Sequence, residues 1–225
     1  MTGWIWLFGI LAVLLAALYC RVNQFGNPQG KLLFKGLASI AFVVLGWLGA
    51  AAGGGGAYAV LMVIGLVLGA VGDVLLQMME CRPQNRESFF RSGLGSFLAG
   101  HVFYIIAFLF IQSVTVWQFL GALVLFGVMF ALQVPARVEL GAQKLPVYLY
   151  GAVISLMAAF AVGAVCTAPS LRSTLVLLGG ILFVVSDAIL ALIFFSPLKK
   201  RSLPTWNLAT YYAGQILLAL SILAK

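Results

Sequence analysis

Eight apolar runs, each about as long as a membrane is thick, occupy almost all of this 225-residue chain. A transmembrane helix needs roughly 20 mostly apolar residues, and no period-2 alternation suggests a membrane barrel instead. The sequence therefore predicts an all-α polytopic membrane protein with eight transmembrane helices, forming one integral membrane domain over residues 1–225. The predicted helices span residues 3–21, 32–52, 57–79, 92–112, 115–134, 145–166, 173–195 and 204–224.

The charge pattern predicts how the chain lies in the membrane. Charged residues make up only 8% of the sequence, against roughly 25% in soluble domains. The net charge of +8 does not indicate nucleic-acid binding, because the cations gather in short segments between apolar runs. Two cations, Arg172 and Lys225, fall on one side, and eleven fall in or beside the connections after the first, third, fifth and seventh runs. These eleven are Arg21, Lys31, Lys35, Arg82, Arg86, Arg91, Arg137, Lys144, Lys199, Lys200 and Arg201.

This bias places those four connections in the cytoplasm and both termini outside. The first run has no cationic leader before it, so it is interpreted as a retained helix and not as a signal peptide. We expect a multi-pass protein of a bacterial inner (plasma) membrane.

Two short patterns recur at the same offset. Gly72-Asp73 and Ser186-Asp187 each precede aliphatic residues, and the two aspartates are 114 positions apart. The pairs Gly100-His101 and Gly214-Gln215 show the same offset. The recurrence suggests an internal repeat, residues 1–112 and 115–225, in which two four-helix halves run parallel.

A few polar residues fall inside the predicted helices at similar depth. Ionisable groups in the hydrocarbon layer are costly and mark candidate functional sites. Counted from the cytoplasmic helix ends, the set lies roughly 9 to 16 Å deep, while Lys35 lies nearer an edge. The set comprises Asp73, His101, Asp187, Tyr212 and Gln215.

Structural roles remain open for each of these residues. Asp73 paired with His101 would be a buried structural contact, and His101, Tyr212 and Gln215 also suit interhelical hydrogen bonds. Anchoring at the membrane interface suits a further set, which comprises Lys35, Arg91, Tyr148 and Tyr150.

Two carboxyl groups in a low-dielectric site suit one chemistry in particular. One can remain protonated as a general acid while the other stays ionised and stabilises a cation. Such a pair fits hydrolysis through an oxocarbenium ion, as in glycosidases and in the cleavage of vinyl ethers. A serine hydrolase is poorly supported without a G-x-S-x-G elbow, and a single histidine disfavours a zinc site. The predicted chemistry requires no cofactor.

An ordered set of residues along nearly the whole chain resembles the lysoplasmalogenase (YhhN-like) family of membrane proteins. The matching residues are Gly72, Asp73, Phe89, Gly93, Phe97, Gly100, His101, Tyr104, Pro146, Tyr148, Tyr150, Met157, Ser186, Asp187, Tyr212 and Gln215. The resemblance implies hydrolysis of the vinyl-ether bond of a lysoplasmalogen to a fatty aldehyde and a glycerophospho head group. It implies a lysophospholipid substrate, membrane lipids as surroundings and no nucleic acid.

The resemblance also implies residue roles. Asp73 and Asp187 would be the catalytic carboxylates, without a decision on which is acid and which is base, and His101 a third catalytic residue. Lys35 would face the lipid phosphate. The side chains implied to orient the enol ether and water are Tyr104, Tyr148, Tyr212 and Gln215.

Two other classes of protein remain open. A proton-coupled transporter or lipid flippase would also have repeated halves and membrane acids. Neither aspartate-bearing segment contains an internal proline, and the polar residues crowd one side of the membrane, which weighs against a carrier. A purely structural membrane protein is the third interpretation, and the shared depth of the polar residues argues against it.

Overall fold

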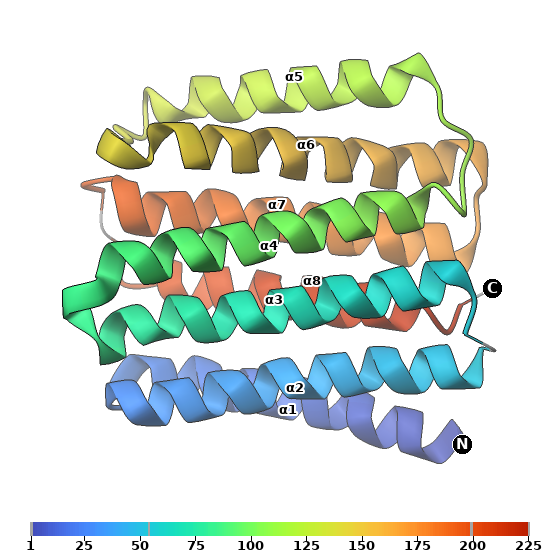
Figure 1. Ribbon diagram of the computed structural model, residues 1–225, viewed down its shortest axis with the longest axis horizontal. Helices are drawn as coiled ribbons and strands as arrows, with labels where there is room; N and C mark the ends of the chain where they lie inside the picture. Colours follow the sequence, from blue (N-terminus) through green and yellow to red (C-terminus); the bar gives the residue numbers. More distant parts are fainter. Residues whose placement is uncertain (1, 54, 199, 225) are drawn as a thin grey trace.

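The computed structural model of this protein describes residues 2–53, 55–198 and 200–224 (Figure 1). Within these ranges the regular structure is helical, which confirms the predicted all-α class with eight long helices. Lys199 and Lys225, assigned above to opposite sides, lie outside the described residues. The α-helices are α1 (Thr2–Phe25), α2 (Pro28–Ala52), α3 (Ala57–Cys81), α4 (Arg86–Phe108), α5 (Val116–Gln133), α6 (Lys144–Thr167), α7 (Leu171–Phe195) and α8 (Leu203–Ser221). Two short 3-10 helices, η1 (Pro83–Asn85) and η2 (Gly141–Gln143), precede α4 and α6.

Seven of the described helices, α1 to α7, are long and apolar enough to cross a membrane. The eighth, α8, is less apolar because it carries Asn207, Tyr211, Tyr212 and Gln215, all of them buried. It packs against α1, α2, α3 and α7, which shield these polar groups. Large apolar side chains such as Trp6 point outward instead. This distribution is that of a multi-pass membrane protein.

Two helices, α2 and α4, begin at least four residues earlier than predicted, and both differences change where a candidate residue lies along its helix. Asn27 caps α2 by accepting a hydrogen bond from Gly30 N at 2.7 Å. Lys35 therefore lies about two turns inside α2 and not in its first turn. Helix α4 begins at Arg86, so its first two turns, which are polar and lie outside the apolar run, are helical too. His101 consequently lies roughly 22 Å along α4 from its first residue, further along the helix than the predicted start implied.

Sequential helices run back and forth through the bundle, so both termini lie at one end (Figure 1). The connections after α1, α3, α5 and α7 lie at the opposite end, which we call the cationic end because it carries the loop arginines and lysines. Helix α5 packs chiefly against α6 at one edge of the bundle, whereas α3 packs closely on α4 and α7 on α8.

The two closest helix pairs approach through glycines at equivalent positions. A Cβ atom on Gly100 would lie 3.1 Å from Gly65 O, and a Cβ atom on Gly214 would lie 3.0 Å from Gly179 O. Both members of the second contact lie 114 positions after those of the first. The α3–α4 and α7–α8 pairs thus share one packing geometry, and this supports the proposed repeat.

Candidate active site

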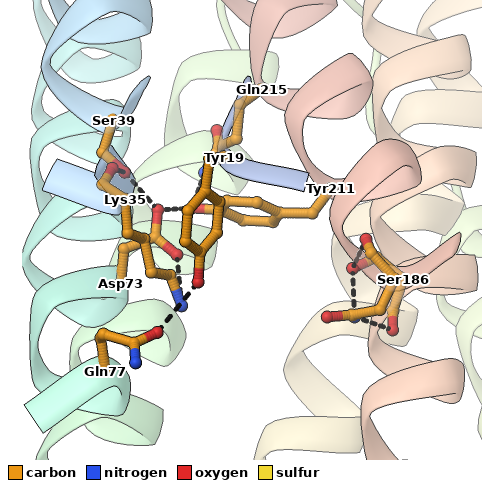
Figure 2. A network of polar contacts seen from close by, with 9 residues as sticks. Tyr19, Lys35, Ser39, Asp73, Gln77, Ser186, Tyr211 and Gln215 are labelled. Carbon is orange, nitrogen blue, oxygen red and sulfur yellow. Dashed lines mark hydrogen bonds and ion pairs between the residues drawn. The ribbon is translucent and has the colours of Figure 1, made fainter. Parts of the chain in front are cut away.

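Asp73 lies at the centre of a buried polar cluster that joins three helices (Figure 2). Its carboxylate accepts a hydrogen bond from the Ser39 hydroxyl at 2.6 Å and from the Tyr211 hydroxyl at 2.7 Å, both at Oδ2. Lys35 Nζ lies 3.3 Å from the other oxygen, Oδ1. We call these four residues, Lys35, Ser39, Asp73 and Tyr211, the Asp73 cluster. Burial of the ion pair is tolerated because Lys35 neutralises the carboxylate at one oxygen and two hydrogen bonds satisfy the other.

The positions of the cluster residues follow from helix geometry. Lys35 and Ser39 are four residues apart on α2, so both face the same neighbour. Asp73 is two turns from the end of α3, and Tyr211 comes from the central helix α8. The aspartate, at 2% exposed, and the lysine, at 8% exposed, are both withdrawn from lipid.

A chain of hydrogen bonds extends the cluster toward α4. The Gln215 amide donates to the Tyr211 hydroxyl at 3.1 Å, and its carbonyl accepts from the Tyr104 hydroxyl at 2.8 Å. Gln215 and Tyr104 are both completely buried. These bonds fix the direction of the Tyr211 hydroxyl, and through it the orientation of the carboxylate.

A polar cavity of about 800 Å³ lies at the cationic end of the bundle, between α1, α2, α3, α7 and α8. Lys35 lines this cavity, as do Tyr19 and Gln77, which are joined by a hydrogen bond of 2.9 Å (Figure 2). Apolar side chains, among them Leu190 and Phe194, line the same space. The cavity therefore suits a molecule with polar and apolar parts, and it leads to the Asp73 cluster through Lys35.

Asp187 lies in a second cluster on the α6 side of α7. It is half-buried and accepts a hydrogen bond from the Tyr150 hydroxyl. The Tyr150 ring lies 5.3 Å from the His101 ring, and both His101 ring nitrogens are buried without a hydrogen-bond partner in the described part of the chain. The His101 ring instead packs on Phe183 at 4.6 Å between centroids.

Within the described ranges, no side chain donates a hydrogen bond to both candidate carboxylates. Phe183 lies between the two clusters, because its ring packs on that of Tyr211 at 5.3 Å and on that of His101. Asp73 is paired with Lys35 and not with His101, which replaces the structural pairing considered above. Lys35 itself is buried, so it does not serve as an interfacial anchor.

Of the candidate tyrosines, Tyr148 lies away from both carboxylates, whereas Tyr212 lies beside the Asp73 cluster, with its ring 5.0 Å from that of Tyr211. The Tyr148 ring packs on Phe130 at 5.6 Å, on the α5 side of α6. Tyr212 is buried against Tyr19, with 6.0 Å between ring centroids.

Sequence reasoning missed four residues of the site, which are Tyr19, Ser39, Gln77 and Tyr211. The signal for Ser39 was its spacing of four from Lys35 and that for Gln77 was the same spacing from Asp73. Within the described residues, no group of three or more His, Cys, Asp or Glu side chains is placed to hold a metal ion.

Seven apolar helices, an eighth helix with buried polar side chains, and a buried acid–cation pair beside a polar cavity define a multi-pass helical membrane protein with a candidate acid–base site. A sequence model of the YhhN family matches residues 30–222. The chain therefore belongs to the YhhN family, which includes lysoplasmalogenase, and the resemblance drawn from the sequence is confirmed. Searches of curated proteins and of solved structures gave no match.

Proposed function

We propose that this protein hydrolyses the vinyl-ether bond of a lysoplasmalogen, releasing a fatty aldehyde and a glycerophospho head group. The observation that carries the proposal is the buried Lys35–Asp73 pair at the inner end of the polar cavity. Membership of the YhhN family supports it. The cavity's mixture of polar and apolar walls fits a single-chain lipid whose polar half enters from the cationic end.

The reaction needs one proton at the enol-ether carbon remote from oxygen and one water at the carbon attached to oxygen. In the proposed mechanism the Lys35–Asp73 pair supplies that proton, and the Asp73 carboxylate stabilises the oxocarbenium ion. The attacking water then returns a proton to the pair. The resulting hemiacetal breaks its bond to the glycerol oxygen, which takes the hydroxyl proton, and the aldehyde leaves.

Asp187 is the second proposed carboxyl group. Tyr150 connects it to His101, because the Tyr150 hydroxyl donates to Asp187 and the Tyr150 ring packs on the His101 ring. We expect Asp187→Asn to lower aldehyde release at least about tenfold and to change the shape of the pH profile of kcat. The measurement is kcat against pH for purified protein in detergent. Wild-type kcat and pH profile in this variant would confine the chemistry to the Asp73 cluster.

Tyr211 is proposed to orient the Asp73 carboxylate. A hydrogen bond to a charged group contributes roughly 1.5–3 kcal/mol, so Tyr211→Phe should lower kcat by about tenfold to a hundredfold. Tyr148→Phe is the matched control, because its ring packs against α5, and it should retain wild-type kcat. Equal losses in the two variants would contradict the proposed location of the site.

One assay separates hydrolysis from transport, the alternative function. Purified protein is incubated with a 1-alkenyl lysophosphoethanolamine, and aldehyde is measured. Catalytic, protein-dependent release of aldehyde supports the hydrolase. Uptake or flipping of the intact lipid by proteoliposomes, without aldehyde release, would instead identify a carrier.

A further inference from the structure

In the part of the chain that the structure describes, two arginines at the mouth of the polar cavity have no carboxylate partner. Arg86 begins α4 and Arg201 lies in the connection between α7 and α8, and both line the cavity. Among the described residues, neither side chain takes part in an ion pair or a side-chain hydrogen bond. They reach the cavity from different connections at the cationic end.

The other cations of the cavity are already neutralised. Lys31 pairs with Glu80 at 3.1 Å near the mouth, and Lys35 pairs with Asp73 at the inner end. The uncompensated positive charge of the described lining therefore belongs to Arg86 and Arg201. A guanidinium group binds phosphate through two parallel hydrogen bonds, and arginine is well suited to that geometry.

We propose that Arg86 and Arg201 bind the phosphate of a lysophospholipid at the mouth of the cavity. This inference rests on the proposed function and assigns the head-group subsite to a pair of residues that the sequence did not single out for it. It also reassigns Lys35, which serves Asp73 and not the phosphate.

Distances along the helices agree with this arrangement. Asp73 lies eight residues before the end of α3, or about 12 Å along its axis, and Arg86 follows directly after η1. In a lysoplasmalogen the three-carbon glycerol backbone separates the enol ether from the phosphate. With the enol ether at the Lys35–Asp73 pair, the phosphate points toward the mouth, where the long arginine side chains extend.

The test measures binding separately from turnover. Three probes are used. The first is a saturated 1-O-alkyl lysophosphoethanolamine, which has no vinyl-ether bond to hydrolyse. The others are the matching 1-O-alkyl glycerol without phosphate and inorganic phosphate. Dissociation constants are measured by calorimetry on purified protein in detergent. Arg86→Gln and Arg201→Gln should each weaken binding of the lysolipid about tenfold, or about 1.4 kcal/mol, and leave binding of the alkyl glycerol unchanged.

Arg82→Gln is the matched control, since Arg82 also follows α3 but does not line the cavity. It should bind the lysolipid as the wild type does. Unchanged lysolipid binding in Arg86→Gln and Arg201→Gln, or an equal loss for the alkyl glycerol, would overturn the proposal. Inorganic phosphate bound as tightly as the lysolipid would assign the arginines to a soluble phosphate and overturn the lipid assignment.

The outcome is distinguishable from a failure of the proposed function. Arginine-dependent binding without any aldehyde release would leave the phosphate site in place and remove hydrolysis. If the protein releases aldehyde but its lysolipid binding does not depend on either arginine, the proposed hydrolysis stands and the proposed phosphate site is excluded.

Discussion

Asp73→Asn abolishes aldehyde release in our account, with an expected loss in kcat of about 10²–10⁴. The amide has almost the same size as the carboxyl group, but it neither stabilises an oxocarbenium ion nor exchanges a proton with Lys35, whose Nζ lies 3.3 Å from the carboxylate. Turnover of a 1-alkenyl lysolipid by purified, monodisperse protein measures the effect.

The matched control for this variant is Glu80→Gln. Glu80 is an acidic residue of the same helix that lines the cavity itself, and it is half-exposed and pairs with Lys31 near the mouth. Since it lies away from the Asp73 cluster, its replacement should leave kcat close to that of the wild type. Wild-type turnover by Asp73→Asn, or an equal loss in Glu80→Gln, would remove Asp73 from the chemistry.

The second large effect concerns Lys35. Lys35→Met removes the cation and leaves the Asp73 carboxylate buried with hydrogen bonds from Ser39 and Tyr211 only. Breaking a buried ion pair on one side costs roughly 3–5 kcal/mol. We therefore expect a clear fall in the thermal unfolding temperature, followed by intrinsic fluorescence in detergent, together with loss of aldehyde release.

The double variant Lys35→Met with Asp73→Asn separates stability from activity. It contains no unpaired buried charge, so much of the thermal stability should return. Aldehyde release should remain absent, because both members of the proton-transferring pair are missing. A double variant no more stable than Lys35→Met alone would contradict the ion pair as the cause of the loss.

The number and kind of helices were predictable because apolar length alone determines them. Helix α8 was predicted as well, over residues 204–224, although its composition alone does not qualify it as a membrane span. Its buried Tyr211 and Gln215 make it less apolar than its neighbours, and four other helices surround it. The early start of α4 was not predicted, since charged residues such as Arg86 and Glu87 end an apolar run without ending a helix.

The partners of the site residues were much harder to predict than the residues themselves. Asp73 stood out as a carboxyl group inside an apolar run. Its contact with Lys35 depends on how α2 and α3 rotate against each other, which their sequences do not determine. Tyr148 and Tyr150 show the same limit, because two residues turn the helix by roughly 200°, and only Tyr150 contacts Asp187.

Aligning the two halves of the proposed repeat shows where they differ. The residues 114 positions after Lys35 and Ser39 are Leu149 and Val153, and the residue 114 positions before Tyr211 is Phe97. Each polar partner of Asp73 thus has an apolar counterpart in the other half. The Lys35–Asp73 pair therefore has no equivalent in the second half of the proposed repeat. This is consistent with one reaction centre and not two.

The central claim is that the protein protonates the carbon of an enol ether and adds water across it. Hydrolysis of a 1-alkenyl lysolipid in D₂O tests this directly, with the aldehyde trapped by reduction and analysed by mass spectrometry. Our account predicts a fatty product with a single deuterium at the carbon next to the aldehyde carbon, formed by the wild type and not by Asp73→Asn. No aldehyde from the wild type, or an aldehyde without that deuterium, would contradict it.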